Sequence, residues 1–328
     1  MSSNLTKEII ERIFKITDNN NFEELTFEVL KFQYKNNIVY KNFVDFLGIN
    51  INNINKIENI PFLPIEFFKT HNVVCNNKVE ITFYSSGTTD IIKSKHHITD
   101  LKIYEKSFIK GFESFYGKIK DYVFLMLLPS YFEQKSSSLL YMCNYLIENS
   151  SKDSGYYLNN FAELFNKLLD LKKRNKKVIL LGVSYALIDF SENYKLDFPE
   201  LIVMETGGMK GRRKEIIKEE FYNALKKCFG VTNIHSEYGM TELLSQAYST
   251  NNGEYRTPPW MNVLIRDIND PLNIINNSGG INVIDLANIN SCSFIATKDL
   301  GKINSNNSFS VLGRFDNSDI RGCNLLIS

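Results

Sequence analysis

The stretch VILLGVSYALIDFSENYKLDFPELIVMETGG, residues 178–208, decides the fold. It begins with an apolar run at 178–181, continues with a helical pattern at 184–193, and returns to an apolar run at 201–205. A strand, a helix and a strand in this order predict a parallel sheet flanked by helices. The pair Gly207-Gly208 follows the second strand, at the carboxyl end where open α/β sheets place their ligands.

The same alternation continues on both sides of this stretch. Apolar runs predict strands at 122–128 and 231–235, and helical spacing predicts helices at 136–148, 161–174 and 213–228. The segment from Glu237 to Glu242 is therefore expected just beyond the strand at 231–235. Two loops suited to a ligand thus follow strands of one parallel sheet.

The two ends of the chain have other patterns. Apolar positions at helical spacing predict helices within 3–48. After Gln246, extended runs separated by Asn, Asp and Gly predict a β-rich portion at 250–312, with antiparallel strands packed beside the α/β part and Asp299 just beyond one strand end. We therefore expect a helical N-terminal segment at 1–48, a large domain at 49–312 and a tail at 313–328.

A hydroxyl-rich turn follows the β-rich run at 79–83 and comprises Ser85, Ser86, Gly87, Thr88 and Thr89. A glycine lets the backbone approach an anion, while N–H and hydroxyl groups donate to its oxygens. The segment is not a Walker A loop, because Ile92 stands where that pattern has a second glycine before the lysine. Two interpretations stay open on these residues alone, a phosphate-binding loop and a Ser/Thr-rich hairpin turn.

Composition narrows the class of protein. The chain has 328 residues, 43% of them hydrophobic and 23% charged, as in globular proteins. Its net charge is +1, which argues against nucleic acid as a partner. The longest apolar run, 122–128, is far shorter than the ~20 residues that span a bilayer. The start of the chain does not have a secretory pattern, and the five cysteines form no CxxC pair, so a cytoplasmic location is expected.

Several ordered segments carry a family resemblance. The hydroxyl-rich turn is followed by Glu205–Gly211, Ser236–Glu242, Thr297–Gly301 and Gly313–Asp316, and this series resembles the adenylate-forming superfamily. Further segments are similar to the acyl-protein synthetases of the LuxE type, namely Leu127–Tyr131, Met204–Arg213, Ser236–Tyr248, Gly280–Leu286 and Arg321–Leu325. The resemblance extends from about Pro61 to Cys323, which is most of the chain.

The resemblance implies a nucleotide site. Ser85 to Thr89 would hold the β and γ phosphates of ATP, Thr241 would supply a hydroxyl to phosphate, and Asp299 would accept hydrogen bonds from the ribose. Arg314 would steady ribose or phosphate near a hinge. Gly207, Gly208 and Tyr238 would pack on the adenine, and Gly239 and Met240 would be further nucleotide-binding residues. Glu242 would bind Mg2+, a hard cation that prefers carboxylate and phosphate oxygens. Taken singly, these residues also fit plainer roles as turn, helix-start and surface residues.

The chain departs from the superfamily pattern at two places. Asp90 follows Thr89 where a glycine is usual, which makes the loop more negative. The superfamily's C-terminal small domain, with its catalytic lysine, has no counterpart here, and Lys210, Arg212 and Arg213 are the nearest cations that could stabilise charge at the α-phosphate.

In the LuxE type a C-terminal cysteine receives the acyl group, and Cys323 is the cysteine so placed. Arg321 would favour its thiolate and Gly322 would give the tail freedom. A bystander cysteine is the alternative. His96 and His97 are expected as a surface turn pair, with His97 as a catalytic base the alternative interpretation.

These observations predict an ATP- and Mg-dependent acyl-protein synthetase with a fatty acid as the expected substrate and Cys323 as the acceptor. An acyl reductase or a carrier protein is the expected partner. Two alternatives remain: a ligase that passes the acyl group to CoA or to a carrier-protein thiol, and a nucleotide-binding scaffold subunit without catalysis.

Overall fold

The computed structural model describes residues 2–76, 78–85, 92–128, 136–207 and 217–315. The helices in this part of the chain are α1 (Ser2–Ile13), α2 (Asn19–Asn36), α3 (Ile38–Phe46), α4 (Phe67–Thr70), α5 (Leu101–Tyr116), α6 (Ser138–Glu148), α7 (Phe161–Lys173), α8 (Ser184–Asn193) and α9 (Lys218–Phe229). Short 3-10 turns lie at η1 (Ile51–Asn53), η2 (Ile57–Asn59), η3 (Ile119–Asp121) and η4 (Leu286–Asn288).

The strands are β1 (Leu63–Pro64), β2 (Ile81–Tyr84), β3 (Lys95–Ile98), β4 (Val123–Leu127), β5 (Gly155–Tyr157), β6 (Val178–Val183), β7 (Ile202–Thr206), β8 (His235–Tyr238), β9 (Ala247–Ser249), β10 (Tyr255–Arg256), β11 (Met261–Arg266), β12 (Ile274–Ile275), β13 (Gly279–Asp285), β14 (Phe294–Ile303) and β15 (Phe309–Arg314). Among the described residues, β2 and β3 form a hairpin, and the other thirteen strands join in one sheet in the order β12-β11-β13-β14-β15-β10-β9-β8-β7-β6-β4-β5, with β1 beside β14.

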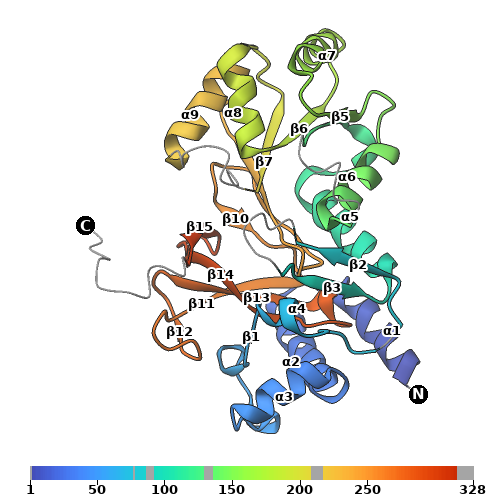
Figure 1. Ribbon diagram of the computed structural model, residues 1–328, viewed down its shortest axis with the longest axis vertical. Coiled ribbons are helices and arrows are strands. Elements are labelled where there is room, and N and C mark those ends of the chain that lie inside the picture. The colour runs from blue at the N-terminus through green and yellow to red at the C-terminus, as the bar shows by residue number, and fades with distance from the viewer. Residues whose placement is uncertain (1, 77, 86–91, 129–135, 208–216, 316–328) are drawn as a thin grey trace.

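The parallel half of the sheet, β4 to β8, confirms the predicted alternation of strands and helices. Its pairs β4–β5, β4–β6, β6–β7 and β7–β8 are all parallel. Every residue of β4 and β6 is buried, as expected for strands covered on both faces. Figure 1 shows α8 and α9 on one side of this half and α5 and α6 on the other.

The antiparallel half, β9 to β15, continues the sheet from β8. The pairs β8–β9, β9–β10, β10–β15, β14–β15, β13–β14 and β11–β13 are antiparallel. The predicted β-rich portion is therefore confirmed. Two register shifts interrupt its pairing, one between Gly280 and Asn282 and one between Leu300 and Gly301.

The predicted N-terminal helices are confirmed, and they pack against the antiparallel half at the other end of the sequence (Figure 1). The fully buried Gln33 of α2 donates from Nε2 to the carbonyl oxygens of Asn288 and Ile289, at 3.0 and 2.9 Å. Asn37 donates to the carbonyl oxygen of Ser291 at 2.8 Å. These buried amides therefore fix α2 and the start of α3 to the segment after β13.

Several predictions about element boundaries and exposure are wrong. The strand predicted at 231–235 is β8 at His235–Tyr238, so Glu237 lies inside the strand. Asp299 lies within β14 and not beyond a strand end. His96 lies in β3 and is fully buried, so it is not a surface turn residue. The helix predicted at 213–228 begins, in the described part of the chain, at Lys218.

Candidate functional site

The candidate site is built where the two halves of the sheet meet. In chain order, β8 ends at Tyr238, a turn carries Thr241 and Glu242, and β9 begins at Ala247. Asp299 of β14 and Arg314 of β15 come from the antiparallel half and reach the same place. Of the predicted residues, Ser86 to Thr89, Gly208, Lys210 and Cys323 lie outside the described part of the chain, as do Arg212 and Arg213.

Tyr238, Asp299 and Arg314 are brought together although 76 positions separate the first from the last. The Tyr238 hydroxyl donates to Asp299 Oδ2 at 2.8 Å, and Arg314 Nε lies 3.2 Å from Asp299 Oδ1. Burial raises the pKa of Asp299, while Arg314 and the Tyr238 hydroxyl act in the opposite direction. The Arg314 side chain is 73% exposed and that of Asp299 only 11%. An anchored carboxylate next to an accessible guanidinium suits a ligand with hydroxyl and phosphate groups.

The register shift in β14 contributes to the placement of Asp299. Its backbone N–H donates to Thr297 Oγ1 at 3.1 Å, and that hydroxyl donates to the Ile281 carbonyl oxygen at 2.9 Å. Opposite β13, the pairs Asn282–Ala296 and Gly280–Leu300 leave three residues of β14, Asp299 among them, facing one residue of β13. A bulge re-aims side chains locally, which allows a polar residue inside a strand to face a site.

Glu242 is a buried carboxylate without an ion-pair partner among the described residues. Burial raises its pKa, and a hydrogen bond with Ser94 is the largest opposing influence, followed by its own backbone and Arg314. No group of three His, Cys, Asp or Glu side chains gathers into a metal site in the described part. A buried carboxylate of this kind fits a Mg2+ ion whose remaining ligands are phosphate oxygens and water.

Asp285 of β13 accepts hydrogen bonds from Leu244 and Ser245 and so stabilises the turn that carries Glu242. Asp285 Oδ2 accepts from the N–H groups of Leu244 and Ser245 at 2.8 and 2.9 Å, and Oδ1 accepts from the Ser245 hydroxyl at 2.6 Å. Asp285 is fully buried, so these bonds replace its hydration. No local pattern in the sequence predicts a role for Asp285, because an acidic residue at the end of a β run is not distinctive.

The end of β7 supplies Gly207, the described residue of the predicted glycine pair. Gly207 adopts a left-handed φ of 68°, which glycine accommodates without strain. Its carbonyl oxygen accepts from the Ser184 hydroxyl at 2.8 Å, and that hydroxyl also lies 2.9 Å from Glu205 Oε2. The exposed Gly207 is therefore held by a hydrogen bond from Ser184 at the start of α8.

Glu205 and Glu237, on neighbouring strands, point to opposite faces of the sheet, because Glu205 pairs with Ser236 and Glu237 with Thr206. On one face Tyr222 donates to Glu205 at 3.3 Å, and on the other the Thr206 hydroxyl donates to Glu237. Burial raises the pKa of Glu237 to about 7. A Cβ at Gly239 would lie 2.4 Å from Glu237 Oε1, so a larger residue there would displace the Glu237 carboxyl.

Comparison with solved structures places the fold among adenylate-forming enzymes. A 2-hydroxyisobutyryl-CoA ligase in complex with 2-HIB-AMP matches with a TM-score of 0.67 and 11% identity, over 90% of this chain and 68% of the ligase. ATP-bound MatB from Rhodopseudomonas palustris matches with a TM-score of 0.51 and 15% identity, over 74% of this chain and 49% of MatB. The match to an ATP-bound RpMatB-BxBclM chimera also covers 49% of that protein. The chain therefore spans about half the length of MatB and of the chimera.

The chain belongs to the LuxE acyl-protein synthetase family, whose model matches residues 14–328. No match was found among curated proteins. Family membership supports an enzyme of the ligase class. Within the described residues, no helix has the length and apolar character needed to cross a membrane.

Proposed function

We propose that this chain uses Mg-ATP to activate a carboxylic acid, with a fatty acid as the expected substrate, and that it passes the acyl group to a protein thiol. The observation that carries the proposal is the convergence of Tyr238, Asp299, Arg314 and Glu242 at the junction of the two sheet halves. Family membership and the fold of ATP-bound relatives support the same reaction.

The first step forms an acyl adenylate. A carboxylate oxygen of the acid attacks the α-phosphorus of ATP, the bond from that phosphorus to the bridging oxygen breaks, and pyrophosphate leaves. Asp299 would accept from the ribose hydroxyls, Thr241 would donate to phosphate, and Glu242 would hold Mg2+ among the phosphates. Gly207, Gly208 and Tyr238 would pack on the adenine, Gly239 and Met240 would be further nucleotide-binding residues, and Ser85 to Thr89 would hold the β and γ phosphates.

Lys210 is proposed as the cation beside the α-phosphate, with Arg212 and Arg213 as its neighbours. Charge accumulates there during in-line attack, and a nearby cation offsets it. A Lys210→Ala variant should lose pyrophosphate exchange by ~10- to 1,000-fold, the scale of one transition-state charge contact. Exchange at the wild-type rate in this variant would exclude Lys210 from that role.

In the second step the Cys323 thiolate attacks the acyl carbon and AMP leaves, which produces a thioester on the chain itself. Tethering raises the effective concentration of the thiol above that of free thiols. An acyl reductase or a carrier protein would then take the acyl group onward. Direct transfer to CoA is the second candidate, and it is favoured by the fold likeness to a protein named as a CoA ligase.

Two measurements test the proposal. Acid-dependent exchange between ATP and labelled pyrophosphate, across a panel of carboxylic acids, tests adenylate formation, and its absence with every acid would favour a non-catalytic nucleotide-binding subunit. Intact-mass spectrometry with acid and Mg-ATP should then show a hydroxylamine-labile acyl adduct that disappears in Cys323→Ser. Thioester formation on CoA at the wild-type rate in Cys323→Ser would favour direct transfer.

A further inference from the structure

Ser94, just before β3, and His96, within β3, are polar residues with buried side chains at alternate positions. Ser94 is 3% exposed and His96 is fully buried, whereas Lys95 between them is exposed and His97 is half-buried. Alternate residues before and along a strand share one face, so Ser94 and His96 point the same way. An inward polar pair of this kind needs partners, because an unpaired buried polar group is costly.

The partners lie on the turn that carries the candidate magnesium and phosphate residues. His96 Nδ1 lies 2.7 Å from the carbonyl oxygen of Thr241, and Ser94 is close enough to the Glu242 carboxyl to oppose the rise that burial causes in its pKa. Thr241 and Glu242 are 145 or more positions from His96 in the sequence. Ser94, just before β3, and His96, within it, thus approach two consecutive residues of the turn.

Asn288 of η4 contacts the same turn from the antiparallel half. Its Nδ2 donates to the carbonyl oxygens of Glu242 and Cys292, at 2.8 and 2.9 Å. This leaves its Oδ1 facing His96 Nε2 at 3.0 Å. The carbonyls of Thr241 and Glu242 are therefore held by two buried side chains that also contact each other.

The hairpin that carries His96 also leads into the hydroxyl-rich turn. Ser85 N–H donates to the Ser94 carbonyl oxygen at 3.1 Å, and Ser94 N–H donates to the Ser85 hydroxyl at 3.0 Å. Phe68 packs edge-on against the His96 ring, with centroids 5.6 Å apart, and limits its rotation. The ring is thus fixed between the hairpin and the turn.

We propose that His96 and Asn288 are positioning residues that fix the Thr241–Glu242 turn relative to the β2–β3 hairpin, so that the hydroxyl and the carboxylate are in place before Mg-ATP binds. This inference rests on the proposed function, since it assigns the turn to nucleotide chemistry. Neither side chain contacts the nucleotide in this proposal. A misplaced reacting group affects turnover more than ground-state binding, and a displacement of about 1 Å can cost ~100-fold in rate.

Substitutions at His96 separate the two contacts. His96→Leu removes both, His96→Asn keeps a donor near the Nδ1 position that faces Thr241, and His96→Gln places its amide near Nε2, where the neutral ring carries no hydrogen. In His96→Leu the kcat of pyrophosphate exchange should fall by ~10- to 100-fold while the ATP dissociation constant changes by less than ~3-fold. His96→Asn should recover most of the loss and His96→Gln little of it.

Asn288→Ala removes the donor to the Glu242 carbonyl and should lower kcat by a similar factor. Lys102→Gln is the control, because Lys102 is exposed in α5, shortly after β3, and has no role in the candidate site. If folded His96→Leu keeps the wild-type kcat, or if His96→Asn is no better than His96→Leu, the inference is wrong.

A second measurement does not depend on activity. The chain has four histidines, so the imidazole ¹⁵N signals of the wild-type protein can be assigned by single substitution. Because the Thr241 carbonyl only accepts, His96 should carry a hydrogen on Nδ1, and its signal should shift when Mg-ATP binds. A ring without that hydrogen overturns the inference. If exchange is absent with every acid, the proposed function fails, while this signal still decides whether His96 holds the turn.

Discussion

Two buried carboxylates, one in each half of the sheet, have different partners. In the parallel half, Glu237 accepts from the Thr206 hydroxyl and has no ion-pair partner among the described residues, and burial raises its pKa to about 7. In the antiparallel half, Asp299 has both a hydroxyl and the Arg314 guanidinium. A guanidinium partner favours the charged form of a carboxylate, whereas burial without such a partner favours the protonated form. The charged groups of the candidate site accordingly come from the antiparallel half and from the turn at Glu242.

Glu242, at the junction of the halves, should show the largest effect. Glu242→Gln keeps the size of the side chain but removes its charge, so Mg-dependent pyrophosphate exchange should fall by ~10- to 1,000-fold. Exchange rates at several Mg2+ concentrations measure this, with the exposed Glu200→Gln as control. Undiminished exchange in Glu242→Gln would show that this residue does not hold Mg2+. The contrast drawn between the two halves of the sheet would then no longer hold.

The difference between the halves also predicts a pH dependence at Glu237. Between the ordinary pKa of 4.5 and about 7, the folded chain keeps a proton on Glu237 that the unfolded chain has released. This carboxyl therefore makes the chain less stable as pH rises through that window, by up to about 3 kcal/mol. Glu237→Gln should be more stable than wild type at pH 8 and nearly equal to it at pH 4.

Denaturant unfolding of both proteins at the two pH values isolates the effect, because other titrating groups are common to both. The buried His96 and the half-buried His235, whose pKa values desolvation lowers to about 4, contribute in the opposite direction in wild type and variant alike. A stability difference that does not change with pH would show that Glu237 is ionised in the folded state.

Asp299 should show a smaller effect, on affinity. Asp299→Asn removes the charge that holds Arg314 and weakens the acceptor for ribose hydroxyls. The loss of such bonds costs about 1 to 3 kcal/mol, so the ATP dissociation constant should rise by ~5- to 150-fold. Calorimetric titration with Mg-ATP measures it. Wild-type affinity in Asp299→Asn would contradict the ribose assignment.

Local pattern predicted most of the parallel half because β4 and β6 are continuous apolar runs and β7 begins with one. It failed where a polar residue inside a strand has a distant partner. Tyr238 and Asp299 bond across 61 positions, and His96 contacts Thr241 across 145. Such contacts depend on the order of strands in the sheet, which periodicity does not specify. The run at 231–234 begins with Val231 and ends with Ile234 and belongs to a predicted strand. The structure begins β8 at His235, where pairing with β7 starts. The roles of site residues came from family resemblance and stay predictions.

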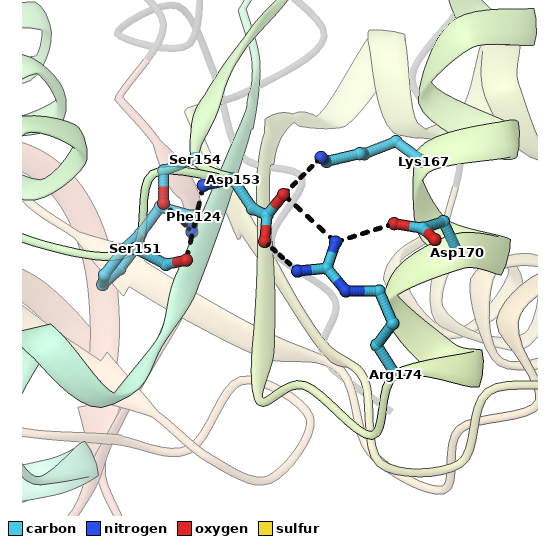
Figure 2. A network of polar contacts seen from close by, with 7 residues as sticks. All are labelled: Phe124, Ser151, Asp153, Ser154, Lys167, Asp170 and Arg174. Carbon is cyan, nitrogen blue, oxygen red and sulfur yellow. Dashed lines mark hydrogen bonds and ion pairs between the residues drawn. The ribbon is translucent and has the colours of Figure 1, made fainter.

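The smallest effect is expected at the outer edge of the parallel half, where Asp153 is paired by two cations. Asp153 accepts from Lys167 Nζ at 2.7 Å and from Arg174 Nη2 at 2.6 Å, and Arg174 also contacts Asp170 (Figure 2). Arg174 and then Lys167 lower the pKa of Asp153 to about 2. The stabilisation is therefore present above the ordinary pKa of 3.8 and is lost as pH falls toward 2.

The side chains of Asp153, Lys167 and Arg174 are 21%, 27% and 42% exposed, so solvent screens the network. Asp153→Asn should cost about 1 kcal/mol of unfolding free energy, and added salt should reduce this cost. Pyrophosphate exchange should keep its wild-type rate, because the network ties the loop before β5 to α7 and includes no residue of the candidate site. Denaturant unfolding at low and high salt measures the first effect. A fall in exchange comparable with that of Glu242→Gln would mean that charge at the edge of the parallel half reaches the site, and the contrast between the two halves would no longer hold.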